Sequence, residues 1–450
     1  MVKSLRLIRR DHLMLFFFAV IISALIYSPF LLSVGMIGLA ALFTFSIDGT
    51  ARGWIRFHPH FLRNFRNFSR SRVHLVITFI FWIIFISGVM TEDWDYWTNR
   101  LIMKLPFLVL PIIFCGLPPL SLKQYWGLLY FLVFALTVTC IGIGINYLLH
   151  FEEINTLMKQ GRPMPTPRNH IRFSLILAIG NLAAFYLWRL GFKFKYDWEP
   201  KAILGAGIFL FVMIHLLSVR SGLAALYLAI LGLGIRYAWQ TGKYWIGLAV
   251  GLGLTILPLT AYYTIPSFQA KVAYVRYEFW IREHNLGGDY SDLWRILSLR
   301  MGMEIGNEHP LIGVGAGNLR QEVRARYAKE YPDIEHVRMP HNQFISTYAG
   351  TGLIGLAIFL FALGYPLYWL LWRGRGSSEN EGETLSLDIS LGNTLFLGFH
   401  IIIFASFMVE NTIENSMGVG IYIFYLLLWL HVHTMLSGKK LPSDTTIGQS

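Results

Sequence analysis

Apolar segments about as long as a membrane-spanning helix recur along most of the chain. A helix needs roughly 20 mainly apolar residues to cross a hydrocarbon core about 30 Å thick. Such segments begin near Leu13, Phe30, Val73, Leu101, Leu122, Ile171, Ala202, Gly222, Tyr244, Phe344, Leu391 and Met417. The pattern predicts an all-α, polytopic integral membrane protein with about twelve transmembrane helices.

The composition agrees with that class. Hydrophobic residues make up 55% of the chain and charged residues only 14%, which excludes a soluble globular protein. The first apolar segment lacks a small-residue cleavage site, so we expect a retained helix rather than a signal peptide. Cys115 and Cys140 lie inside predicted spans without metal-ligand spacing, which favours packing roles. We expect one integral membrane domain over residues 1–450.

Basic residues gather in alternate connections between the predicted spans. Because cytoplasmic loops of membrane proteins are rich in Lys and Arg, these connections are expected to face the cytoplasm, together with both chain ends. The residues concerned are Lys3, Arg6, Arg9, Arg10, Arg52, Arg56, Arg63, Arg66, Arg70, Arg72, Arg189, Lys193, Lys195, Lys201, Arg236, Lys243, Arg373, Arg375, Lys439 and Lys440. This topology explains most of the net charge of +12, so no nucleic-acid partner is expected. Segments 374–383 and 437–450 are polar and predicted to be flexible, non-catalytic stretches.

The longest polar excursion is the predicted outer loop 265–341. Apolar residues at 293, 296, 297 and 301 have helical spacing, which predicts a helix over 290–304 with Ser291 or Asp292 as its N-cap. A second helix is expected over 319–331. Glycines 313, 315 and 317 lie between them and predict a tight turn. No strand leads into these glycines, so a dinucleotide-binding motif is not supported.

Three basic residues fall on the outer side instead of the cytoplasmic one: Arg220, Arg295 and His341. Each has a plain interpretation when taken alone. Arg220 fits an interfacial arginine that reaches lipid headgroups, and Arg295 fits a solvated charge on an amphipathic helix, where Arg300 or Arg320 could serve as well. A lone loop histidine is more often a hydrogen-bonded residue than a catalyst.

Taken together, however, these residues lie in motifs that resemble the O-antigen ligase and polymerase superfamily. Arg295 is followed by Glu308-His-Pro-Leu-Ile-Gly-Val-Gly-Ala-Gly-Asn318, then by His341-Asn-Gln-Phe-Ile and by Gly350-Thr-Gly-Leu-Ile-Gly355. The turn Ser218-Val-Arg-Ser-Gly222 resembles the family's upstream arginine element, although its sequence departs from a plain Ser-Arg-Gly turn. Glu410-Asn-Thr-Ile-Glu-Asn415 resembles its last outer turn. The resemblance extends over about residues 200–430.

The resemblance implies a bacterial inner-membrane enzyme with a periplasmic site. Such an enzyme moves a glycan from a polyprenyl-diphosphate carrier, such as undecaprenyl diphosphate, to a lipid A–core hydroxyl in lipopolysaccharide biosynthesis. Arg220 and Arg295 suit the stabilisation of a diphosphate leaving group, and His341 suits a general base or an acceptor-positioning group. Asn342 could orient the imidazole or cap the next helix. No metal or other cofactor is expected, and the resemblance implies inversion at the anomeric carbon.

Other residues and functions stay open. Glu410, His215 and Arg300 are further substrate-binding candidates, although His215 also fits an interhelical hydrogen bond, as Asn146, Asn181 and His400 do. The acidic segment Glu92-Asp-Trp-Asp95 has the carboxylate spacing of a divalent-cation site, although its aromatic neighbours favour an acidic interfacial loop.

The acceptor is not resolved by the sequence either. A polymerase that lengthens another carrier-linked repeat and a protein O-oligosaccharyltransferase use the same carrier. A lipid-linked oligosaccharide flippase is the non-enzymatic alternative. A flippase is expected to carry charges along a path through its spans, whereas Arg220, Arg295 and His341 gather at one face.

Overall fold

The computed structural model describes residues 9–47, 55–283, 291–331, 337–373 and 383–436. Nearly all of these residues form helices, which confirms the all-α prediction. The helices are α1 (Arg10–Tyr27), α2 (Pro29–Thr44), α3 (Phe61–Arg70), α4 (Arg72–Ile77), α5 (Phe79–Ile86), η1 (Ser87–Met90), α6 (Trp94–Phe114), α7 (Leu122–Leu149), α8 (Phe151–Lys159), α9 (His170–Leu190), α10 (Glu199–Leu217), α11 (Arg220–Thr241), α12 (Tyr244–Thr264), α13 (Pro266–Glu283), α14 (Ser291–Glu308), α15 (Leu319–Glu330), α16 (Gln343–Tyr368), η2 (Trp369–Arg373), α17 (Glu383–Val409) and α18 (Ser416–Leu436). Strands β1 (Phe45–Ile47) and β2 (Ile55–Phe57) pair as an antiparallel hairpin.

Eleven helical stretches of the described chain are long and apolar enough to cross a membrane. The twelfth predicted span is α2, which is apolar but only 16 residues long. One span is made of α4, α5 and η1 together and covers Arg72–Met90. The multi-pass membrane architecture predicted from the sequence is therefore confirmed, with one short helix among the expected spans.

Three differences between the predicted boundaries and the structure bear on the candidate site. The span expected to begin near Leu101 begins at Trp94, because Asp93 caps α6 by accepting a hydrogen bond from the Tyr96 amide. The first part of the predicted outer loop is a helix, α13, which was not predicted from the sequence. Helix α14 begins at Ser291, so the N-cap expected at Ser291 or Asp292 is placed too late. The predicted helix at 319–331 is confirmed as α15.

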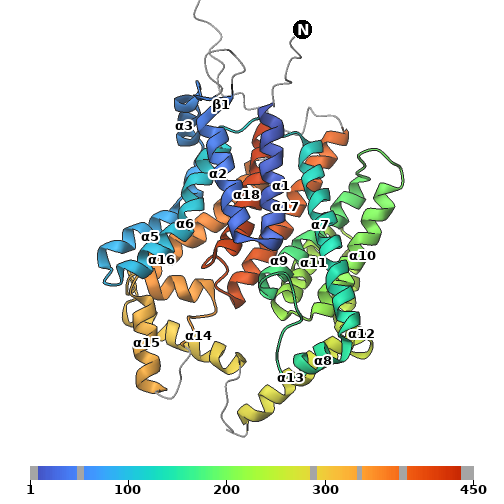
Figure 1. Ribbon diagram of the computed structural model, residues 1–450, viewed down its shortest axis with the longest axis vertical. Coiled ribbons are helices and arrows are strands. Elements are labelled where there is room, and N and C mark those ends of the chain that lie inside the picture. The colour runs from blue at the N-terminus through green and yellow to red at the C-terminus, as the bar shows by residue number, and fades with distance from the viewer. Residues whose placement is uncertain (1–8, 48–54, 284–290, 332–336, 374–382, 437–450) are drawn as a thin grey trace, which may run out of the picture.

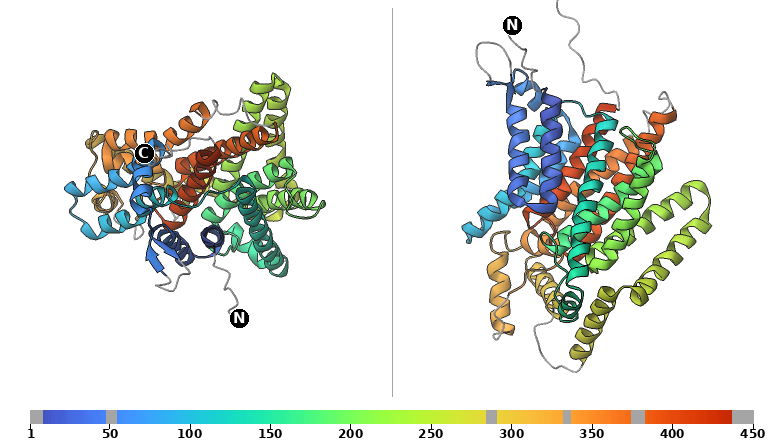
Figure 2. Two further views of the ribbon diagram at one scale, coloured as in Figure 1. Left: turned by 90° about the horizontal axis from the view of Figure 1, so that it is seen from above. Right: turned by 45° about the vertical axis from the view of Figure 1, so that its right-hand side comes forward.

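The helices share one bundle with two distinct ends (Figure 1). The start of α1, the β hairpin and α3 lie at one end, and α8, α13, α14 and α15 lie at the other, which we call the site end. Helices α9 and α18 form the centre, with 83% and 94% of their spans buried. Helix α12 has only 6% buried, and it stands away from the bundle together with α13 (Figure 2). The predicted flexible segments fall on residues 374–382 and 437–450, outside the described residues.

Candidate functional site

The glycine-rich loop after α14 docks its backbone against a break in α16. Gly352 has φ +65° and ψ −170°, which interrupts the helix, and such a conformation is essentially restricted to glycine. The amides of Leu353 and Ile354 donate to the carbonyls of Pro310 and Leu311 at 2.8 and 3.2 Å. The loop carbonyls therefore provide hydrogen-bond acceptors for the two amides that the break frees, as apolar surroundings require.

The glycines of that loop permit the close approach. Gly313 and Gly315 have φ +68° and +90°, and a Cβ on Gly313 would collide with the backbone of Thr351. The amide of Val314 also donates to the Ala349 carbonyl at 3.1 Å. The predicted tight turn is confirmed, and Gly313 allows the loop backbone to pack against the backbone of α16.

Asn318 ends the loop and ties it to the start of α6. Its side-chain Nδ2 donates to the Met90 carbonyl at 2.7 Å, and its Oδ1 accepts from the Glu92 amide at 2.7 Å. Helices α14 and α15 also share a small apolar core that includes Met301, Ile305 and Leu319. These contacts fix α14, and hence Arg295, relative to the spans.

The carboxylate of Glu410 joins two of the predicted site residues. Nη2 of Arg295 donates to Glu410 Oε1 at 2.9 Å. Nδ1 of His341 lies 3.5 Å from Glu410 Oε2, at the outer limit of a hydrogen bond. The side chain of Glu410 is only 7% exposed, whereas those of Arg295 and His341 are 31% and 27% exposed. The buried acid thus holds two partly accessible groups side by side at the site end.

The electrostatics of this trio favour an ionised Glu410. Burial raises the pKa of the Glu410 carboxyl, but the hydrogen bond from His341 and the positive charges of His341, Arg295 and Arg172 outweigh burial and lower it. An ionised carboxylate accepts but cannot donate, so it favours a proton on Nδ1, the His341 atom that faces it. A neutral imidazole in this orientation has its unprotonated Nε2 directed away from Glu410.

Neighbouring contacts fix the positions of these groups. Ser298 donates to the Arg295 carbonyl at 2.8 Å and accepts from the His341 amide at 3.4 Å. Asn342 caps α16 by accepting from the amides of Phe344 and Ile345 at 2.9 and 3.0 Å. Its Nδ2 donates to the Met408 carbonyl at 2.8 Å. Of the two roles predicted for Asn342, the structure supports the helix cap.

Arg220 lies at the same end of the bundle. It is exposed and forms the first residue of α11, two residues after Ser218, whose left-handed φ of 52° turns the chain. A Cβ on Gly222 would collide with Ser174, so the glycine of this turn lets α11 pack closely on α9. Arg172 lies two residues before Ser174 on α9 and donates to the Asn411 carbonyl at 3.1 Å. Asn411 directly follows Glu410. These contacts bring the start of α11 toward the Glu410 turn.

Two lower-ranked candidates have other partners. Nδ1 of His215 lies 2.7 Å from the Phe211 carbonyl, and its Nε2 lies 2.6 Å from the Tyr227 hydroxyl on α11. His215 therefore makes the interhelical hydrogen bond that was one of its two interpretations. Arg300 is exposed and pairs with Glu304 at 2.7 Å, one turn along α14. The structure brings neither residue to Glu410.

The acidic segment after η1 is also engaged by protein groups. Asp93 caps α6 and pairs with Arg320 at 2.9 Å. The cap hydrogen bond and the charge of Arg320 lower the pKa of Asp93. Within the described ranges, no group of three or more His, Cys, Asp or Glu side chains has an arrangement suited to a metal ion.

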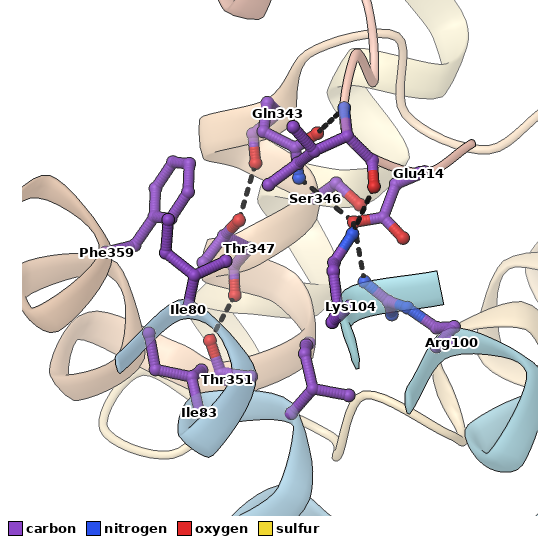
Figure 3. Close-up of a pocket in the computed structure, with 13 residues that line it drawn as sticks. Ile80, Ile83, Arg100, Lys104, Gln343, Ser346, Thr347, Thr351, Phe359 and Glu414 are labelled. Atoms are coloured by element: carbon purple, nitrogen blue, oxygen red, sulfur yellow. Dashed lines mark hydrogen bonds and ion pairs between the residues drawn. The ribbon is translucent and has the colours of Figure 1, made fainter. Parts of the chain in front are cut away.

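A second carboxylate of the same turn anchors a buried charge network (Figure 3). Glu414 Oε1 lies 2.9 Å from Lys104 Nζ and 3.1 Å from Arg100 Nη2, and it accepts from Gln343 Nε2 at 3.1 Å. Lys104 also donates to the Ile413 carbonyl, and Ile413 donates its amide to Gln343 Oε1 at 3.2 Å. The pocket lined by these residues has about 20 Å³ of free space, room for roughly one water. The network is therefore a brace for the turn and not a glycan pocket.

Neither this network nor Arg172 was predicted from the sequence. Arg100 and Lys104 are spaced four residues apart, so they lie on one face of α6. Basic residues within an apolar helix signal a buried partner, and that pattern could have identified them. Arg172 begins an apolar segment and could have been noticed for the same reason.

A comparison with known protein families matches the part of the chain that contains most of the candidate site residues. Residues 205–360 match the family model described as O-antigen ligase. The match includes Arg220, Arg295 and His341 but ends before Glu410. No curated protein sequence matches the chain significantly. The family match covers residues 205–360 of the 450-residue chain, and it supports a glycan-processing function of the ligase or polymerase type.

Proposed function

We propose that the protein transfers a glycan from a polyprenyl-diphosphate carrier to a lipid A–core hydroxyl. The observation that carries the proposal is that one buried carboxylate, Glu410, contacts both Arg295 and His341. The two groups match the two needs of this reaction, which are stabilisation of a phosphate leaving group and removal of a hydroxyl proton. The match of residues 205–360 to the O-antigen ligase family model supports the glycan-processing part of this assignment.

In the proposed step, the acceptor oxygen attacks the anomeric carbon from the side opposite the carrier. The bond between that carbon and the diphosphate oxygen breaks, and its electron pair leaves with the diphosphate. Arg295 uses Nη2 for Glu410, and its other N–H groups suit the negative charge that develops on the phosphate. Arg220 is proposed as a second cation for the same charge. Attack from the opposite side inverts the anomeric configuration.

His341 is proposed to take the proton of the acceptor hydroxyl at Nε2. Glu410 faces Nδ1 and so holds the imidazole in the tautomer that leaves Nε2 able to accept. The carboxylate also stabilises the imidazolium that forms. Glu410 is thus proposed as a positioning residue for both Arg295 and His341.

We further propose the orientation that this reaction requires. The basic helix α3 and the start of α1 would face the cytoplasm, because basic residues concentrate there. The site end would then face the periplasm of a bacterial inner membrane. We retain the single-domain assignment for residues 1–450, with 265–341 as the segment that carries Arg295 and His341.

The acceptor distinguishes the remaining candidates. The purified protein is given a polyprenyl-diphosphate glycan, either with lipid A–core or alone. Product on lipid A–core is expected for a ligase, whereas lengthening of the donor alone would indicate a polymerase. If neither product forms while the folded protein binds the donor, the ligase proposal fails. A protein acceptor and a flippase are then tested by peptide glycosylation and by transport in vesicles.

A further inference from the structure

Arg172 is a buried arginine whose hydrogen-bonding groups are only partly used. It lies on the first turn of α9, and the residue is 8% exposed. Its Nη2 donates to the Asn411 carbonyl at 3.1 Å. Its Nε and Nη1 are buried and have no hydrogen-bond partner among the described residues. A guanidinium in such surroundings normally has acceptors for these N–H groups.

Its charge is also incompletely balanced. Within the described part of the chain, no carboxylate lies at ion-pair distance from Arg172. The nearby acid, Glu410, directs its two oxygens to Arg295 and His341. The positive charges of Arg295 and Arg172 both act on that one carboxylate. Two guanidiniums thus share one negative charge, and a buried cation without its own anion is unfavourable.

We propose that Arg172 is a third arginine of the donor site and binds a phosphate oxygen of the carrier diphosphate beside Arg295. An anionic oxygen would supply both the missing charge and the missing acceptors. A diphosphate diester carries two negative charges, so it suits two neighbouring guanidiniums better than one.

The alternative is that Arg172 only braces the turn 410–415 through the Asn411 carbonyl. The two roles differ in how they affect ligands with one and two phosphates. A brace that positions Glu410 would affect both kinds of ligand alike. A contact to the second phosphate would affect only the diphosphate.

The inference rests on the proposed function, because it assumes a lipid-diphosphate donor. The test is the affinity of the purified full-length protein for undecaprenyl diphosphate and undecaprenyl monophosphate in detergent. The variants are Arg172→Met and a matched control, Arg168→Met. Arg168 is exposed, precedes α9, and donates to the Tyr27 carbonyl at 3.1 Å. The control therefore removes one positive charge close to α9 in sequence but leaves Arg172 in place.

We expect Arg172→Met to weaken diphosphate binding roughly tenfold to a hundredfold, the range for a lost hydrogen bond to a charged group. Monophosphate binding should change little, and Arg168→Met should change neither affinity. If Arg172→Met lowers the expression of folded protein, Arg172→Lys keeps the buried charge and should still weaken diphosphate binding, to a smaller extent. An unchanged diphosphate affinity in the variant, or an equal loss for both lipids, would overturn the inference. A wild-type protein that binds neither lipid would overturn the donor assignment itself, and the role of Arg172 with it.

Discussion

The Glu414 network allows a quantitative prediction about how the site turn is held. Glu414→Ala removes the one carboxylate that pairs with both Arg100 and Lys104. The side chains of Arg100 and Lys104 are only 5% and 2% exposed, so the variant leaves two buried cations unpaired. Removing one partner of a buried ion pair typically destabilises by about 3–5 kcal/mol. We expect a loss of at least that size.

The variant Glu414→Gln tests the charge of this side chain separately from its shape. The amide oxygen can still accept a hydrogen bond from Lys104 or Arg100, so this variant loses the negative charge but keeps an acceptor and should be less destabilised than Glu414→Ala. The predicted order of stability is therefore wild type, then Glu414→Gln, then Glu414→Ala. The assay is loss of the monodisperse peak in size-exclusion chromatography after heating in detergent.

The control for this series is Asp197→Ala. Asp197 pairs with Lys193 at 2.5 Å, but the two side chains are 92% and 54% exposed. An exposed pair of this kind contributes little, so the control should melt with the wild type. Equal melting of Glu414→Ala and wild type would refute the reasoning, because it would mean that the buried cations do not need Glu414.

Three further predictions concern the helix break, the site carboxylate and metal ions. Gly352→Ala places a Cβ against the Leu311 backbone at a φ of +65°, a strain of about 1–3 kcal/mol before the collision is counted. Gly352→Ala should therefore lower thermal stability. The control, Gly364→Ala in the same helix, has open space for a Cβ and should not. Equal melting temperatures of the two variants would contradict the close packing of the glycine-rich loop on α16. The pKa of Glu410 is lower in the folded protein than in the unfolded chain, where it is near 4.3. The ionised carboxylate therefore contributes its full stabilisation above the unfolded pKa, and this stabilisation is lost as the pH falls through the folded pKa. Glu410→Gln should thus be less stable than wild type at pH 7 but lose less stability between pH 6 and pH 3, and parallel pH curves would show that Glu410 is not held by its cations. EDTA should leave glycan transfer unchanged, and a loss that a divalent cation restores would redirect attention to Asp93 and Asp95.

Local sequence patterns were sufficient to predict most of the helices. Hydropathy predicts the spans because each must present apolar side chains along about 20 residues, and helical spacing predicted α14. The same patterns did not predict α13, whose mixture of Lys, Arg, Glu and aromatic residues hides its helical period. They also began α6 too late, because Asp95 and Arg100 gave its first turns the polarity of a loop.

The contacts of the site depend on tertiary structure. Arg295 and His341 could be selected by residue type and by resemblance, but their link through Glu410 joins residues 115 positions apart for Arg295. Lys104 and Glu414 are 310 positions apart. No local pattern reports such pairs. Asn342 had two equal interpretations in sequence, and its hydrogen bonds to the Phe344 and Ile345 amides decided between them.

The most direct test of the account is glycan transfer to lipid A–core by the purified wild type and by Arg220→Ala, Arg295→Ala and His341→Ala. Each variant is first shown to be folded by its melting temperature. Loss of general base catalysis typically lowers the rate 10²- to 10⁴-fold, so we predict that His341→Ala loses activity to about that extent and that both arginine variants fall to background. Full activity in all three folded variants would contradict the assignment of the Glu410 cluster as the site of transfer.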